Sequence, residues 1–209
     1  MRLTLVDKKR LTSNIKSFVF LPHKNEDLRG EMRFFTISSS PFEKRIAITT
    51  RIFKKKSSFK KALDNLKIGE KIQAKGPDGD FVIEDFKKHH VFIAGGIGIT
   101  PFIAIIRQKD YEKKPINVNL LYANKTKRTA FKKDLDEIAS RHKEFKLSYI
   151  FSPKKIEKNV LSKFFKNKKI IFFVSGPDPM VDNITKILLE EGVLEENIKQ
   201  DYFSGYKKI

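Results

Sequence analysis

Val91-Phe-Ile-Ala-Gly-Gly-Ile-Gly-Ile-Thr-Pro101 is the stretch that decides the fold of the second half of the chain. Its first four residues, Val91–Ala94, form a continuous apolar run that is typical of a strand buried on both faces. Glycines follow, and then a helix is expected over Thr100–Arg107 with Pro101 in its first turn. A strand that turns directly into a helix directs backbone N–H groups and the positive end of the helix dipole toward an anion.

The glycines after this strand suit a phosphate site. Gly96 and Gly98 allow a close approach of backbone to a diphosphate, and Thr100 can cap the helix or bond a phosphate oxygen. The spacing is G-x-G-x-x-P and lacks the third glycine of the dinucleotide fingerprint. A tight turn that merely needs glycine is therefore the alternative.

The rest of the second half alternates between strands and helices. Strands are expected at 118–122, 146–151, 169–174 and 199–203, and helices at 128–141, 160–165 and 178–191. This alternation predicts a C-terminal α/β doubly wound parallel sheet, in which ligands bind beyond the carboxyl ends of the strands.

Two further strand ends carry residues that suit a dinucleotide. The strand at 169–174 leads into Ser175-Gly-Pro-Asp-Pro-Met180, a second glycine-bearing turn before a helix. Two such turns in one sheet favour a shared ligand over two ordinary loops. After the strand at 118–122, Asn124, Lys125 and Arg128 stand where an acidic residue would hold a ribose 2′-hydroxyl, which hints at a 2′-phosphate and NADP.

Residues 1–87 show a different pattern. Short runs of β-branched and aromatic residues predict strands at 2–6, 14–20, 32–38, 45–53 and 71–75. A single helix is expected after Ser57 and Ser58, which can cap it. This predicts a small N-terminal β-barrel or sandwich, and polar residues at 85–89 place its boundary with a second domain, 88–209.

Arg33-Phe34-Phe35-Thr36 carries the chemistry of the first half. On a strand Arg33 and Phe35 face the same way, so an arginine able to bind phosphate stands beside an aromatic wall for a flat heterocycle. An exposed arginine on a hydrophobic strand is the alternative.

Composition limits the classes of function. The 209 residues carry a net charge of +19 and no cysteine, which excludes disulfides, thiolate metal sites and cysteine-bound iron–sulfur clusters. The charge would attract nucleic acid, anionic lipid or an acidic protein, but no nucleic-acid motif accompanies it, and a lysine-rich proteome explains it at least as well. We expect no metal site, no signal peptide, no membrane span, no nucleic-acid partner and a cytoplasmic location.

Five motifs, in order, resemble those of the ferredoxin–NADP reductase superfamily. They are Arg33–Thr36 for R-x-Y-[ST], Gly76–Phe81 for G-P-x-G-x-F, Gly95–Pro101 for G-G-x-G-x-T-P, Ser175–Met180 for C-G-P-x-x-M, and Asp201–Tyr206 for an acidic-aromatic C-terminus. The resemblance covers essentially the whole chain. It implies an N-terminal antiparallel FAD-binding β-barrel followed by an NAD(P)-binding domain.

The resemblance also implies roles for the matching residues. In the catalytic motif, Phe35 would stack on the isoalloxazine and Thr36 would hydrogen-bond near flavin N5. The other residues expected at FAD are Arg33 and Phe34 of the same motif, Thr49, Thr50, Ser57, Ser58 and Phe203. The residues expected at the nicotinamide dinucleotide are Gly95, Gly96, Gly98, Thr100, Pro101, Asn124, Gly176, Pro177 and Met180. Arg33 and the helix beginning at Ser57-Ser58 would bind the FAD diphosphate, and Tyr206 would join Phe203 near the flavin.

The chain also departs from the superfamily pattern. Phe35 replaces a tyrosine, Ser175 replaces a cysteine, and Lys55-Lys56 stand where relatives often have glycine. Pro22 leads almost directly into a turn at 23–30, where relatives carry another strand, so we count five candidate strands against six. We therefore expect a barrel one strand short, which bears on its closure and on FAD binding.

The expected function is hydride transfer from NAD(P)H to FAD and delivery of electrons to a separate, acidic carrier such as ferredoxin or flavodoxin. The first alternative is a degenerate reductase-like binding or regulatory subunit without FAD. A basic nucleic-acid-binding protein ranks last.

Overall fold

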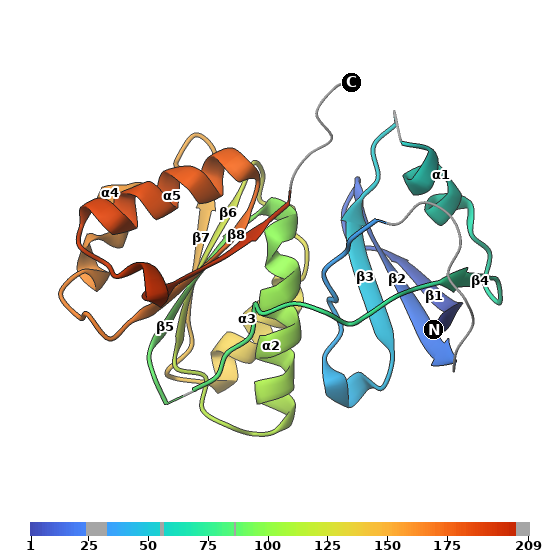
Figure 1. Cartoon of the computed structure of the whole chain (residues 1–209), viewed down its shortest axis with the longest axis horizontal. Coiled ribbons are helices and arrows are strands. Elements are labelled where there is room, and N and C mark those ends of the chain that lie inside the picture. Colours follow the sequence, from blue (N-terminus) through green and yellow to red (C-terminus); the bar gives the residue numbers. More distant parts are fainter. Residues whose placement is uncertain (24–32, 55–56, 86, 204–209) are drawn as a thin grey trace.

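The computed structural model describes residues 1–23, 33–54, 57–85 and 87–203. These residues are arranged around two β-sheets (Figure 1). The first half forms a four-stranded antiparallel sheet in the order β3-β2-β1-β4. Its strands are β1 (Arg2–Arg10), β2 (Ile15–His23), β3 (Ile46–Arg51) and β4 (Lys71–Gln73). Alternate residues such as Leu5, Phe18 and Phe20 are fully buried, and Phe59 of helix α1 (Ser58–Asn65) packs against this core.

The expected barrel that lacks a strand is an open half-barrel. Within the described residues, the strand predicted at 32–38 is wrong, because residues 33–38 contain only a bridge from Ile37 to Ile48 of β3. Serine hydroxyls bond the backbone where a ladder would otherwise continue: Ser38 donates to the Ala47 carbonyl at 3.1 Å and Ser39 to the Arg45 carbonyl at 2.8 Å. Met32 and the turn expected at 24–30 lie outside the described residues.

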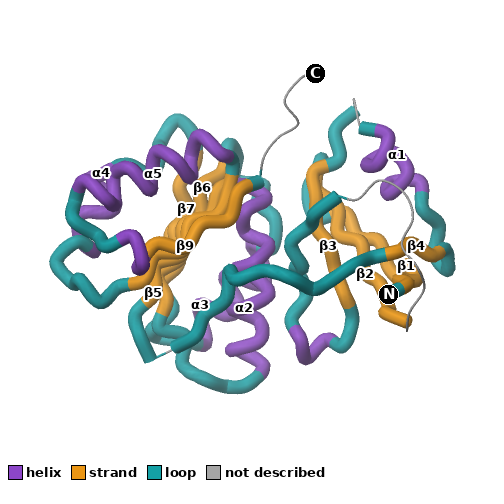
Figure 2. Tube along the Cα trace, viewed as in Figure 1, coloured by secondary structure: helices purple, strands orange, loops and turns teal. Residues whose placement is uncertain are grey.

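The second half forms a five-stranded parallel sheet in the order β7-β6-β5-β8-β9. Its strands are β5 (His90–Gly95), β6 (Val118–Asn124), β7 (Lys146–Phe151), β8 (Ile171–Gly176) and β9 (Ile198–Tyr202). Helices α2 (Thr100–Tyr111) and α3 (Lys132–Arg141) pack on one face, and α4 (Lys158–Leu161) and α5 (Asp178–Glu190) on the other (Figure 2). The predicted doubly wound sheet is confirmed, with β5 buried at its centre.

Boundaries in this half follow the expected pattern closely, except at α3. The helix begins at Lys132 rather than near Arg128, because Phe131 adopts a left-handed conformation with φ 59°. Strand order changes direction at β5, with β6 on one side and β8 on the other. The carboxyl ends of these three strands therefore bound one crevice, which is where the glycine turns lie.

The segment that connects the two sheets already packs against the second sheet before β5 begins. Phe81 sets its ring 5.0 Å from that of Phe173 and 5.7 Å from that of Phe102. Among the described residues, no helix combines the length and the apolar character that a bilayer crossing requires.

Candidate functional site between the two sheets

The two glycine turns meet at the centre of the parallel sheet. A Cβ on Gly176 would lie 3.1 Å from the Cα of Gly95 and 2.9 Å from the Cε of Met180. Gly176 ends β8 beside Gly95 of β5, and Pro177 caps the start of α5. The structure thus brings together the four residues that the sequence predicts at this crevice. Because Gly95 and Gly176 have no side chain, the Met180 side chain can pack against both of them.

The remaining residues of the first glycine turn contact protein. A Cβ on Gly98 would collide with the Ser175 carbonyl, so this glycine allows the turn at Gly96–Ile99 to pack on the end of β8. Thr100 is fully buried and donates its hydroxyl hydrogen to the Ile97 carbonyl at 3.1 Å. Thr100 is thus the first residue of α2 and bonds the preceding turn, whereas Ile99 takes the N-cap position without a side-chain hydrogen bond; Pro101 is buried in the first turn of α2 as expected. A phosphate-binding role for this turn stays a prediction.

Asn124 provides a test of whether the crevice suits a polar ligand. It ends β6, and its side-chain amide nitrogen is buried without a hydrogen-bond partner among the residues that the structure describes. An unpartnered buried donor is costly, and a ligand oxygen would remove the cost. The neighbouring Lys125 and Arg128 are exposed. The residues present therefore fit a phosphorylated, hydrogen-bonding ligand.

A polar cluster joins the two halves of the chain. The Thr36 hydroxyl donates to Oδ2 of Asp201 at 3.5 Å, and the Ser175 hydroxyl donates to the same oxygen at 3.4 Å. Burial raises the pKa of Asp201, and the two hydroxyls oppose that rise. Asp201 and Ser175 belong to motifs quoted above, yet sequence reasoning gave neither a role. The acidic position before the C-terminal aromatic residues was the signal that could have found Asp201.

The other residues expected at FAD are distributed unevenly. Phe35 stacks on Phe59 of α1 with ring centroids 5.6 Å apart. The helix begins as expected, since Ser57 is its N-cap and accepts from the Lys60 amide at 3.3 Å. Arg33, Phe34 and Ser58 are exposed, and Phe203 donates its amide hydrogen to the Gly176 carbonyl at 2.9 Å.

Thr49 and Thr50 of β3 are buried. The Thr49 hydroxyl lies 2.7 Å from the Ser38 hydroxyl, so the two side chains hydrogen-bond each other. A flavin-lining role for Thr49 and Thr50 stays a prediction.

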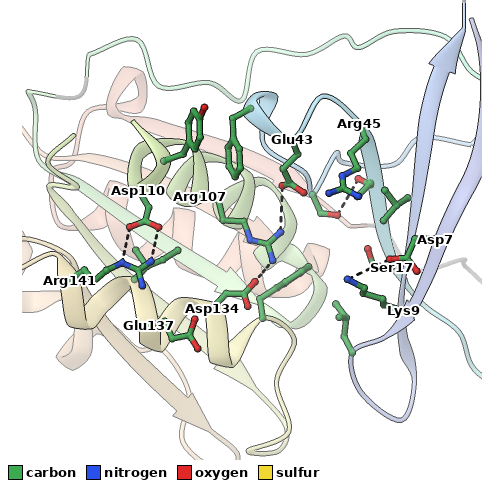
Figure 3. A pocket seen from close by; sticks show the side chains of 18 residues that line it. Asp7, Lys9, Ser17, Glu43, Arg45, Arg107, Asp110, Asp134, Glu137 and Arg141 are labelled. Carbon is green, nitrogen blue, oxygen red and sulfur yellow. Dashed lines mark hydrogen bonds and ion pairs between the residues drawn. The ribbon is translucent and has the colours of Figure 1, made fainter. Parts of the chain in front are cut away.

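A groove of about 460 Å³ lies elsewhere between the halves (Figure 3). It is bordered by the 3₁₀ turn Pro41–Glu43, by β1 and by helices α2 and α3. In it Arg107 pairs with Glu43 at 3.7 Å and with Asp134. None of the predicted site residues lines this groove.

Comparisons with known proteins agree with this arrangement. Residues 92–186 match the family model of an oxidoreductase NAD-binding domain. Flavohemoprotein A of Dictyostelium discoideum is 26% identical over 200 residues, which cover 89% of this chain and 50% of that protein. The chain spans about a third to a half of the length of the first curated relatives that it matches.

Two solved structures share the fold over nearly their whole length. The flavohem-like FAD/NAD binding domain of nitric oxide dioxygenase from Vibrio cholerae superposes with a TM-score of 0.82 at 18% identity and covers 98% of both chains. The ferredoxin-NADP+ reductase of Plasmodium falciparum gives a TM-score of 0.79 at 18% identity, with 97% of this chain and 95% of that chain covered. Together these findings confirm the expected superfamily, and the family model assigns residues 92–186 to an oxidoreductase NAD-binding domain.

Proposed function

Because the chain belongs to the ferredoxin–NADP reductase-like superfamily, we propose that it is a flavoprotein oxidoreductase that takes hydride from NAD(P)H and passes electrons to a separate acceptor. Residues 1–87 would hold FAD, and residues 88–209 would hold the nicotinamide dinucleotide. When bound, FAD accepts a hydride and releases electrons singly or in pairs.

The polar cluster of Thr36, Ser175 and Asp201 is the observation that carries this proposal. It lies where the flavin motif of the first half meets the crevice of the second, and one carboxylate oxygen accepts from both hydroxyls. Asp201 orients the two hydroxyls toward a common point. Burial also raises the pKa of this carboxyl, so it takes up a proton more readily than an exposed aspartate does.

The surrounding residues would bind and orient the cofactors. Phe35 would supply an aromatic face backed by Phe59, and Arg33 would supply a guanidinium for the FAD diphosphate. Gly95, Gly176 and Met180 would shape the floor beneath the nicotinamide, and Phe203, tied to Gly176, would exclude water from it.

For the acceptor we propose an acidic one-electron carrier of the ferredoxin or flavodoxin type. The chain has no cysteine for an iron–sulfur cluster of its own, and its net charge of +19 would steer an acidic partner by complementary potential.

The visible spectrum of the purified protein tests the proposal. We expect flavin absorbance that NADH or NADPH bleaches without oxygen, with reoxidation by the carrier. Thr36→Ala should slow the bleaching about 10- to 100-fold while flavin stays bound, since one positioned hydrogen bond is removed. Thr185→Ala is the matched control, because Thr185 is half-buried on α5 and its hydroxyl accepts from Gln200 rather than bonding Asp201. Flavin-bound protein that neither nucleotide bleaches would contradict the proposal.

The open half-barrel favours one second candidate, a reductase-like subunit without FAD. The described part of the first sheet has four strands, and its two Thr residues expected at the flavin are buried. A colourless protein that takes up no FAD from solution would favour this candidate.

A further inference from the structure

Two lysines lie on the core face of the first sheet. Lys8 of β1 stands opposite Phe18 of β2, and Lys16 precedes Phe18 by two residues. Paired residues, and residues two apart in a strand, point to the same face, so both lysines share the face of the fully buried Phe18. The Lys8 ammonium lies 5.5 Å from the centroid of the Phe18 ring, and the Lys16 side chain is only 17% exposed. Because an ammonium group loses hydration in such a place, it needs polar partners there.

The partners are at the C-terminal end of helix α1. Lys8 Nζ donates to the Asp64 carbonyl at 2.6 Å and to the Leu66 carbonyl at 2.8 Å, and Lys16 pairs with the Asp64 carboxylate. The last carbonyls of a helix lack partners within the helix, and the negative end of its dipole favours a cation. The two ammonium groups therefore fasten one end of α1 to the core face of β1 and β2.

The fastened helix supports the aromatic residue of the flavin motif. Phe59 lies in the first turn of α1, and its ring is stacked on that of Phe35 at an interplanar angle of 29°. Phe59, Leu63 and Leu66 recur at helical spacing and pack together in the core of the first sheet. Phe59 and Asp64 are about 7.5 Å apart along the helix axis, so the ring and the fastened end belong to one short rigid body.

We infer that Lys8 and Lys16 are positioning residues for the isoalloxazine ring of the flavin. The inference rests on the proposed function, in which Phe35 supplies the aromatic face, and it adds residues that none of the five motifs contains. The lysines would act through α1: with its end fastened, Phe59 holds the Phe35 ring in one orientation, which preorganises the stacking surface. The nearly buried pair of Lys16 and Asp64 serves this single geometry more than it serves stability.

Equilibrium dialysis of the purified protein against FAD tests the inference. Lys16→Met keeps an apolar stem and removes the ammonium group. We expect the Kd for FAD to rise about 3- to 10-fold, the range that loss of an aromatic stacking contact produces. Phe59→Leu should raise the Kd by a similar factor with the ion pair intact. Asp64→Asn, which leaves Lys16 an amide oxygen, gives the same comparison in a milder variant, with a rise of about 2- to 5-fold.

Two further measurements separate positioning from a structural role. The double variant Lys16→Met/Phe59→Leu should bind FAD no more than about twofold more weakly than Phe59→Leu alone, because both changes remove the same support. The fluorescence anisotropy decay of bound flavin should show faster local motion of the ring in each single variant. Lys16→Arg keeps the charge and should restore the wild-type Kd and anisotropy decay.

Lys109→Met is the matched control, because the Lys109 side chain is 11% exposed and pairs with Glu112 on the second half of the chain at 3.5 Å. It should lower the melting temperature as Lys16→Met does and leave the Kd for FAD unchanged. A Lys16→Met protein that loses stability but keeps the wild-type Kd and anisotropy decay would make the inference wrong. Effects that multiply in the double variant would also overturn it, because they place the action of Lys16 away from Phe59. A wild type that takes up no FAD would overturn the proposed function itself.

Discussion

At the scale of single residues, Asp201 combines a stability cost with a proposed role. Its raised folded-state pKa means that the fold favours the neutral carboxyl, so ionisation at neutral pH destabilises the protein. Asp201→Asn removes the charge and keeps an oxygen for Thr36 and Ser175. We expect a higher melting temperature than the wild type at pH 7 to 8, with a difference that shrinks as the pH falls through the pKa of Asp201.

The same substitution should slow flavin reduction, because an amide oxygen accepts more weakly than a carboxylate from the hydroxyls of Thr36 and Ser175 and orients them less firmly. Thermal denaturation across pH and anaerobic stopped-flow reduction measure the two effects. Asp182→Asn is the control, since Asp182 accepts from Tyr202 at an exposed site. An Asp201→Asn protein less stable than the wild type at pH 8 would contradict the assignment.

Sequence reasoning reached some of these residues and missed others for physical reasons. Gly95, Gly176 and Met180 could be predicted because strand ends in a parallel sheet converge. Thr36 could be predicted from its motif, but its partner Asp201 lies 165 residues away, a distance that no local pattern spans. The contact of the Arg51 guanidinium with Gly96 gave no motif signal, because it depends on which way the end of β3 faces.

At the scale of elements, a 3₁₀ turn of the first half fastens helix α2. The Ser40 hydroxyl donates to the Ala104 carbonyl at 2.6 Å and the Phe42 amide to Gln108 Oε1 at 3.0 Å. Phe42 also stacks on Tyr111 with ring centroids 4.2 Å apart. These contacts follow one face of α2, whose first residues adjoin the glycine turn.

Phe42→Ala should therefore weaken the contact between the first half of the chain and α2. Loss of the stacked, half-buried ring is expected to cost about 1–3 kcal/mol of unfolding free energy. Hydrogen exchange should become faster at residues 42–44 and along α2. Phe53→Ala, which removes a half-exposed ring, is the control and should change stability by about 0.5 kcal/mol or less. Unchanged exchange in α2 would show that the turn does not fasten it.

The strands and helices of the second half could be predicted almost completely, because its apolar runs and caps agree with the tertiary structure. The first half could be predicted less well. The stretch 33–38 has strand-like composition, but its serines bond neighbouring carbonyls and leave only the bridge at Ile37. Phe131 shortens α3 by adopting a backbone conformation that composition does not signal.

At the scale of the whole molecule, His90 should make the fold sensitive to acid. This side chain at the start of β5 is 1% exposed, and burial is the main cause that lowers its pKa to about 4. Below the unfolded-state value of about 6.5 the unfolded chain takes up a proton that the folded chain refuses. Stability present above that pH is then lost as the pH falls toward 4, by about 3 kcal/mol.

Urea unfolding at several pH values measures this loss. His90→Gln should flatten the profile between pH 6.5 and 4, whereas His142→Gln, which replaces a partly buried side chain paired with Asp110, should leave the decline in place. An equally steep decline in His90→Gln would assign the acid sensitivity to other groups.

The net charge of +19 predicts a strong effect of salt on electron delivery. Electrostatic steering of an acidic carrier weakens once the ionic strength shortens the Debye length. The second-order rate of carrier reduction should fall about tenfold or more from low to high NaCl, while the rate with an uncharged quinone stays nearly constant. A salt-independent carrier rate would remove the argument for an acidic partner.

The fastening of α2 limits how this protein could be recombined with others. A chimaera that exchanges only residues 88–209 would separate Tyr111 and Gln108 from the turn that they fit, even if every cofactor contact were preserved. Grafted nucleotide modules should therefore be transferred together with residues 40–43, or with a matching turn from the donor. In this architecture, the contact between residues 40–43 and α2 decides whether the two halves can be exchanged, and this contact lies away from the proposed cofactor site.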